Sequence, residues 1–156
     1  MIKEIIIRDY KNIKYLKLKD LRKVNVFVGK NYCGKSNILS YIKENYHKID
    51  VDVIDDIERG LDWESQEYKI KSLLNKCEQS FISTHSLDIL NFIAWSYGKK
   101  YWKEENEELY YNNDEIPEQF TVINLVKKED GNYIIAKYSE SKLYLAIYKQ
   151  KLEIRH

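Results

Sequence analysis

Residues 29–36 read GKNYCGKS, which places two glycines, a lysine and a serine within eight positions. This order matches the pattern G-x-x-x-x-G-K-[ST], in which the glycines allow successive backbone N–H groups to point at phosphate oxygens. In such a loop Lys35 reaches the β- and γ-phosphates of a nucleotide, and the Ser36 hydroxyl coordinates Mg²⁺. We interpret the stretch as a phosphate-binding loop, the alternative being an ordinary surface turn.

The loop residues are themselves the expected nucleotide contacts. They are Gly29, Lys30, Asn31, Tyr32, Cys33, Gly34, Lys35, Ser36 and the following Asn37. A tyrosine at position 32 is unusual, because this position favours residues that tolerate a left-handed backbone. Cys33 is interpreted as a small loop residue, with a redox switch as the alternative.

Acids and a histidine that suit a magnesium–phosphate site follow downstream. Asp55 and Asp56 come directly after the apolar residues Val53 and Ile54. Asp55 is predicted to hold Mg²⁺ through water, and Asp56 to act as general base or to orient the attacking water. His85 ends the apolar run FIST and is predicted to hydrogen-bond the γ-phosphate or water. The alternatives are a solvated acidic turn and a structural histidine.

The hydrophobic pattern predicts the elements that must position these residues. The expected strands are Ile5–Ile7, Ile13–Leu18, Val24–Gly29, Val51–Asp55 and Ser80–Ser86, followed by a hairpin of residues 120–126 and 133–139 around Asp130-Gly131-Asn132. The expected helices run from Lys35 to about Tyr46, from a cap at Asp62 to about Cys77, from near Leu87 after a cap at Ser86, and from near Ser139 to Tyr148. Residues 99–117 are expected to form a mobile loop or frayed helix end.

This order of elements favours one α/β domain over residues 1–156. We expect a P-loop NTPase sheet flanked by helices, with antiparallel N-terminal strands at an edge of the sheet and a C-terminal β-hairpin plus helix. The helix after residue 62 is expected to use Tyr68, Ile70, Leu73 and Leu74 as its apolar positions.

Composition limits the classes of function. The 26 basic and 25 acidic residues give a net charge of +1, which argues against nucleic-acid binding by bulk charge alone. The two cysteines form no CxxC pair, so neither a disulfide framework nor a zinc site is expected. The N-terminus does not read as a signal peptide, and no apolar stretch is long enough to span a membrane. A cytoplasmic protein is expected.

With these motifs in place, the chain resembles the ABC-type ATPases of the SMC, RecF and overcoming-lysogenization-defect (OLD) group. The resemblance is carried by the N-terminal block ending GKSNIL, by VIDDIERGLD, by SFISTHSLDIL, and by the tail FTVINLVKKEDGNYIIAKYSESKLYLAI. It implies that Asp55 and Asp56 are the Walker B acids, that Asp62 is the D-loop acid and that His85 is the switch histidine. It also implies ATP rather than GTP as the nucleotide, with Mg²⁺, and an activity that serves a DNA-related or defence process.

Two departures from that group affect the expected activity. Asp56 stands where the family has a catalytic glutamate, one methylene longer, and the shorter side chain predicts slower hydrolysis. Only 18 residues separate Ser36 from Asp55, where the family places a helical lobe with its signature motif. In the family this motif completes the ATP site of a second subunit, so this chain has only its own half of a site.

The sequence leaves three hypotheses for function. The first is a minimal ATPase in which Lys35, Asp56 and His85 are the catalytic residues. The second is a nucleotide-binding interaction module, whose site is completed by a homodimer partner or another protein covering the nucleotide face. A small P-loop kinase is disfavoured because no cluster of arginines suggests a lid. DNA is a possible partner through the basic, aromatic stretch YGKKYWK at residues 97–103, for which an exposed helix end is the simpler interpretation.

Overall fold

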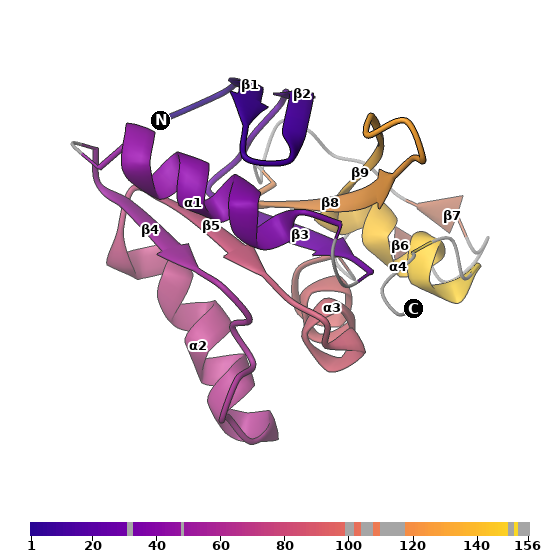
Figure 1. The fold of residues 1–156 in the computed structure, drawn as a ribbon. Coiled ribbons are helices and arrows are strands. Elements are labelled where there is room, and N and C mark those ends of the chain that lie inside the picture. The colour runs from indigo at the N-terminus through magenta and orange to yellow at the C-terminus, as the bar shows by residue number, and fades with distance from the viewer. Residues whose placement is uncertain are drawn as a thin grey trace.

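The fold is built around one five-stranded mixed sheet (Figure 1). The computed structural model describes residues 1–30, 33–47, 49–98, 102–103, 108–109, 118–149 and 152. The strand order is β4 (Val51–Ile54), β5 (Gln79–Ser83), β3 (Val24–Gly29), β8 (Phe120–Lys127) and β9 (Tyr133–Ser139). The first four strands run parallel, and β9 pairs antiparallel with β8. The predicted α/β class, the central place of β3 and the C-terminal hairpin are therefore confirmed.

Helices cover both faces of this sheet (Figure 1). One face packs against α1 (Lys35–Asn45), and the other against α2 (Trp63–Lys76), α3 (Leu87–Ile93) and α4 (Glu140–Tyr148). A π-helical turn, η1 (Ala94–Gly98), follows α3 directly. In β3, Phe27 belongs to the first core and Val26 to the second, as the two-residue period of a strand requires. Burial of both faces makes β3 the rigid base from which the loop at residues 29–36 starts.

The N-terminal strands differ from the expectation. β1 (Ile5–Tyr10) and β2 (Ile13–Leu18) pair antiparallel with each other and form a separate two-stranded sheet, not an edge of the main one. Their inward side chains, including Ile7 and Leu16, join the core that contains Ile38 of α1. The apolar face of this small sheet is thus buried because it packs in the same core as α1. Pairing with an edge strand of the main sheet is not needed to bury it.

The starts of α2 and α3 follow the predicted caps. The Asp62 carboxylate accepts a hydrogen bond from the Ser65 N–H at 2.8 Å, and this bond lowers the pKa of Asp62. Ser86 accepts one from the Ile89 N–H at 3.3 Å. The prediction that Tyr68 is an apolar position of α2 is wrong, because its side chain is 75% exposed.

Helix geometry explains the exposure of Tyr68. Ile70 and Leu73 of α2 are buried, and Leu74 packs beside them. Tyr68 lies two positions before Ile70, and two residues turn a helix by about 200°. Its ring therefore points away from the sheet.

Most of the segment expected as a loop, residues 99–117, lies outside the described residues. Within it, β6 (Trp102–Lys103) pairs antiparallel with β7 (Glu108–Leu109). The suggested base-stacking side chains of residues 99–103 are likewise outside what the structure describes. Among the described residues, no helix is long and apolar enough to span a bilayer.

Candidate functional site

The loop at residues 29–36 joins the end of β3 to the start of α1, as the sequence predicts. Gly34 precedes the helix with φ of 97°, a left-handed conformation that residues with a Cβ rarely adopt. A Cβ at Gly34 would also collide with the Tyr133 hydroxyl oxygen. A Cβ at Gly29 would lie 2.7 Å from both the Cys33 sulfur and the Leu125 carbonyl oxygen. Both glycines are therefore required by the path of the backbone.

Lys35 lies against the loop and is almost completely buried, with 6% exposure. Its ammonium group donates hydrogen bonds to the carbonyl oxygens of Gly29 at 2.7 Å and Lys30 at 3.1 Å, and it lies 3.7 Å from the Cys33 sulfur. These contacts fix a positive charge at the N-terminal end of α1, where the helix dipole also favours an anion. The expected contacts of Asn31 and Tyr32 lie outside the described residues.

The predicted metal ligands lie in direct contact. The Ser36 hydroxyl donates to one oxygen of Asp55 at 2.7 Å, and the Ser83 hydroxyl donates to the other. Ser83 in turn accepts a hydrogen bond from the Asp56 N–H at 2.8 Å. A hydroxyl beside a carboxylate is the oxygen chemistry that Mg²⁺ prefers, so these residues fit that ion. Within the described residues no group of three or more His, Cys, Asp and Glu side chains could hold a metal, and Mg²⁺ does not need one when phosphate oxygens and water complete its shell.

Asp56 lies between two nitrogen groups. One carboxylate oxygen is 3.3 Å from Nε2 of His85, and the other accepts a hydrogen bond from the Arg59 guanidinium at 2.7 Å. Asp56 and His85, each predicted as a site residue, therefore lie in contact at one edge of the sheet. Arg59 was not predicted, although its i,i+3 spacing from Asp56 in the turn after β4 is a signal that could have identified it.

Glu58 is a second residue that sequence reasoning did not find. Its carboxylate accepts hydrogen bonds from the Thr84 hydroxyl and from the His85 N–H, both at 2.8 Å. These bonds connect the turn after β4 to the end of β5 and thereby fix the backbone of His85.

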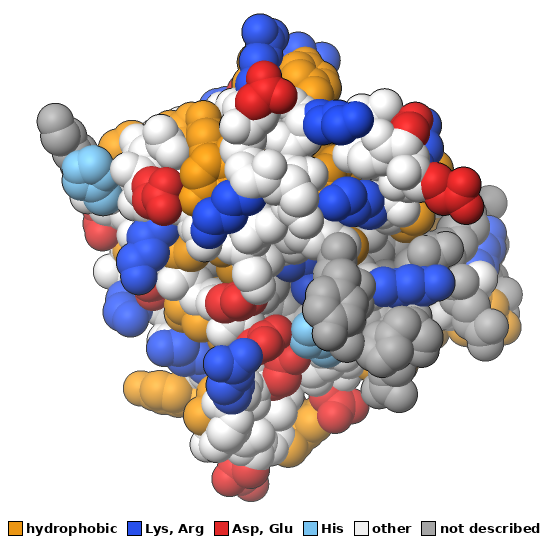
Figure 2. All heavy atoms as spheres, in the orientation of Figure 1, with side chains coloured by type: hydrophobic (Ala, Val, Ile, Leu, Met, Phe, Trp, Pro, Cys, Tyr) orange, Lys and Arg blue, Asp and Glu red, His pale blue; other side chains and the backbone are white. Residues whose placement is uncertain are grey.

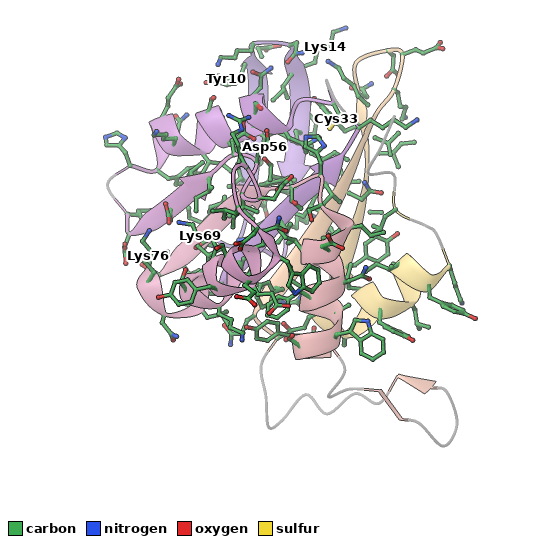
Figure 3. All side chains as sticks on the ribbon, turned by 90° about the horizontal axis from the view of Figure 1, so that it is seen from below. Tyr10, Lys14, Cys33, Asp56, Lys69 and Lys76 are labelled. Carbon is green, nitrogen blue, oxygen red and sulfur yellow. The ribbon has the colours of Figure 1, made fainter. Side chains whose placement is uncertain are left out.

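In Figure 3, Asp56 lies between the β1–β2 sheet, which carries Tyr10, and α2, which carries Lys69.

The loop residues and the acids described above meet at one cleft of about 610 Å³ at the carboxyl ends of the parallel strands. The lining residues are Asn12, Gly34, Lys35, Ser36, Asn37, Asp55, Asp56, Arg59 and His85. Figure 2 shows acidic, basic and histidine side chains grouped near the middle of this face. We call Gly34, Lys35 and Ser36 the loop end of the cleft, and Asp55, Asp56, Arg59 and His85 the acid end.

Three of the predicted contacts that the structure describes do not line the cleft, and one residue besides Arg59 that lines it was not predicted. Gly29, Lys30 and Cys33 belong to the loop but are not lining residues, and Cys33 is buried. Asn12, from the β1–β2 turn, was not predicted; it accepts a hydrogen bond from the Asn37 amide at 2.6 Å. The small N-terminal sheet therefore contributes one wall of the cleft.

Tyr133 supports the loop from the β8–β9 hairpin. Its hydroxyl oxygen is buried behind Gly34 and has no hydrogen-bond partner among the described residues. Burial raises the pKa of Tyr133, and the nearby Cys33 raises it further. The hydroxyl thus fills space behind the loop without a hydrogen bond to any part of the chain that the structure describes.

Comparison of the chain with models of known protein families, with curated proteins and with solved structures gives no match. The residues and geometry of the cleft are therefore the basis on which a function is assigned.

Proposed function

We propose that this chain binds Mg-ATP in the cleft and hydrolyses it slowly, as a minimal ATPase of the ABC type that the sequence resembles. The observation that carries the proposal is the meeting of Lys35, Ser36, Asp55, Asp56 and His85 around one cleft. They come from the ends of three adjacent parallel strands, β3, β4 and β5, which is where α/β sheets commonly bind ligands.

The loop end supplies the affinity for the triphosphate. Backbone N–H groups of the loop and the N-terminus of α1 face the phosphates, and Lys35 provides the fixed cation for the outer ones. Ser36 and Asp55 would hold Mg²⁺, which neutralises charge on the β- and γ-phosphates. The choice of ATP over GTP rests on the resemblance.

The acid end supplies the groups for hydrolysis. The oxygen of a water molecule bonds to the γ-phosphorus, while the bond from that phosphorus to the β–γ bridging oxygen breaks and its electron pair stays on ADP. The Asp56 carboxylate accepts the proton of the water, and His85, 3.3 Å from Asp56, hydrogen-bonds the γ-phosphate or the water. The products are ADP and inorganic phosphate. The short aspartate side chain is the reason for a slow reaction.

A second candidate is a nucleotide-binding interaction module that needs a partner chain for turnover. The observation that favours it is the short connection between α1 and β4, which consists of residues 46–50. This connection leaves no room for the helical lobe whose signature motif covers the γ-phosphate in the resembling family. A second copy of the chain, or another protein, would then complete the site.

Phosphate release from Mg-ATP distinguishes these candidates. We expect turnover by the unaltered chain that is lost in Lys35→Ala and on chelation of Mg²⁺. Asp56→Asn should lower turnover by about 10²- to 10⁴-fold while ATP binding is retained, because it removes only the general base. Asp52→Asn is the matched control and should leave turnover unchanged, because Asp52 lies in β4, the strand that leads to Asp56, but pairs with Lys76 outside the cleft.

Two results would argue against hydrolysis by this chain. ATP binding with turnover no higher than that of Lys35→Ala would favour the interaction module. Equal loss of turnover in Asp52→Asn and Asp56→Asn would show that the effect is not specific to the cleft.

A further inference from the structure

Arg59 lines the cleft, but the mechanism above gives it no task. Its guanidinium donates to Asp56 at 2.7 Å, on the carboxylate oxygen that does not face His85. The Asp56 side chain is 25% exposed, whereas that of Arg59 is 77% exposed. The Asp56 carboxylate is therefore held in place, whereas the Arg59 side chain is largely free of packing contacts.

The backbone fixes where the arginine side chain begins. The Arg59 N–H donates to the Asp56 carbonyl oxygen at 2.9 Å, and Asp56 itself has φ of 47°, a left-handed conformation. This turn holds the Arg59 backbone at the acid end, while the long side chain can change rotamer in solvent. Exposed ion pairs of this kind are weak, so the guanidinium can exchange one anionic partner for another.

The charges of the cleft favour such an exchange. Among its lining residues the cations are Lys35 and Arg59, and the acids are Asp55 and Asp56. Lys35 is buried at the loop end. A γ-phosphate entering beside Asp56 would place like charges close together unless a cation stands with them. The planar guanidinium of Arg59 suits this place, because its donors match phosphate oxygens in a bidentate arrangement.

We propose that Arg59 leaves Asp56 and binds the γ-phosphate when a nucleoside triphosphate enters the cleft. The same movement releases the Asp56 carboxylate to accept the proton of the attacking water. The inference rests on the proposed function and adds a specificity to it: the cleft prefers triphosphates to diphosphates through Arg59. Arg59 also supplies positive charge at the γ-phosphate from within one chain, which a second chain would otherwise provide.

The test compares binding of Mg-ATP and Mg-ADP by calorimetry, together with single-turnover phosphate release. In Arg59→Ala we expect affinity for Mg-ATP to fall by about 10- to 100-fold, as for loss of charge-assisted hydrogen bonds, with affinity for Mg-ADP unchanged. Turnover should fall by about 10³-fold. Arg59→Lys should recover part of the ATP affinity but little of the turnover, because an ammonium lacks the planar fork.

Arg8→Ala is the matched control, since Arg8 lies over the Tyr15 ring on the β1–β2 sheet and does not line the cleft. It should change neither affinity. An unchanged ratio of ATP to ADP affinity in Arg59→Ala would overturn the inference, as would turnover equal to or faster than that of the unaltered chain, which would make Arg59 only a counter-ion of Asp56. Should the unaltered chain bind neither nucleotide, the proposed function itself fails, and that result is visible before any variant is made.

Discussion

At the loop end of the cleft, the backbone and a buried ammonium group set the geometry; at the acid end, hydrogen bonds between side chains do. Gly34 has no space for a Cβ, and Lys35 is buried against the loop carbonyls. By contrast, Asp56 and Arg59 are joined across a turn, and the arginine side chain is mostly in solvent. The first arrangement resists change, whereas the second permits exchange of partners.

This difference suggests a division of tasks within one cleft. A rigid cradle can bind phosphate without reorganisation, which favours affinity. An adjustable set of charged groups can change its contacts as the γ-phosphate arrives, which favours chemistry over ground-state binding. Variants of the loop end should therefore affect mainly binding, and variants of the acid end mainly turnover, except that Arg59 affects both because it is proposed to bind the γ-phosphate.

Of the three variants that probe this comparison, Gly34→Ala at the loop end is expected to have the largest effect. The substitution forces a Cβ into a left-handed backbone, at a cost of about 1–2 kcal/mol, and against the Tyr133 hydroxyl. We expect ATP affinity to fall by about 5- to 30-fold, as a cost of this size gives if it falls on the nucleotide-binding conformation. Nucleotide titration and chemical denaturation measure the two effects.

Gly131→Ala is the matched control, because Gly131 has φ of 85° but lies in the β8–β9 hairpin with no close contact to a new Cβ. This variant should lose stability because of its left-handed backbone alone, and its affinity for ATP should be unchanged. Equal ATP affinity in both variants would contradict a rigid loop end.

A smaller effect, on turnover and stability but not on nucleotide affinity, is expected from Ser83→Ala at the acid end. The fully buried Ser83 hydroxyl contacts both Asp55 and the Asp56 N–H, so its loss leaves these groups without a partner and costs about 1–3 kcal/mol of stability. We expect turnover to fall by about 10-fold, because the acids lose their positions. Affinity for ADP without Mg²⁺ should be unchanged.

Ser72→Ala on α2, where the hydroxyl donates a hydrogen bond to the Lys69 carbonyl oxygen, is the corresponding control and should keep normal turnover. A Ser83→Ala variant that turns over normally but binds nucleotide poorly would reverse the assignment of tasks.

The smallest effect is expected from Tyr133→Phe, behind the loop. Because the hydroxyl has no partner among the described residues, its removal should change stability at neutral pH by at most about 1 kcal/mol and leave ATP affinity unchanged. The raised pKa of Tyr133 means that the folded chain favours the neutral phenol, so stability that is present below the ordinary tyrosine pKa of 10.0 is lost as pH rises through the folded pKa. The phenylalanine variant should therefore lose less stability above that pH in denaturation curves. A clear fall in ATP affinity would instead assign the hydroxyl a ligand contact.

Most of the fold was predictable from the sequence because its signals are local. The apolar run of β3 indicated a buried central strand, and Asp62 and Ser86 marked the starts of helices that the structure confirms. The separate β1–β2 sheet was not predictable, because an apolar strand face is equally well buried by edge pairing or by packing beside α1. That choice depends on tertiary contacts.

The site was predictable only in part for the same reason. The sequence indicated Lys35 and Ser36 by their spacing in the loop, and Asp55 by its position after a strand. The topology of the sheet then brings the backbones of these residues together. Ser83 and Arg59 act through contacts between elements or through side-chain direction, which periodicity does not encode. Arg59 in particular faces Asp56 because a left-handed residue tightens the turn.

Calorimetric titration with Mg-ATP tests the central claim, that this cleft binds a magnesium-bound triphosphate, most directly. The account predicts saturable binding by the unaltered chain, weakened by about 10- to 100-fold in Lys35→Ala through loss of a charge-assisted contact, and unchanged in Lys43→Ala on the exposed side of α1. No saturable heat with either Mg-ATP or Mg-GTP, or equal affinity in Lys35→Ala and the unaltered chain, would contradict it.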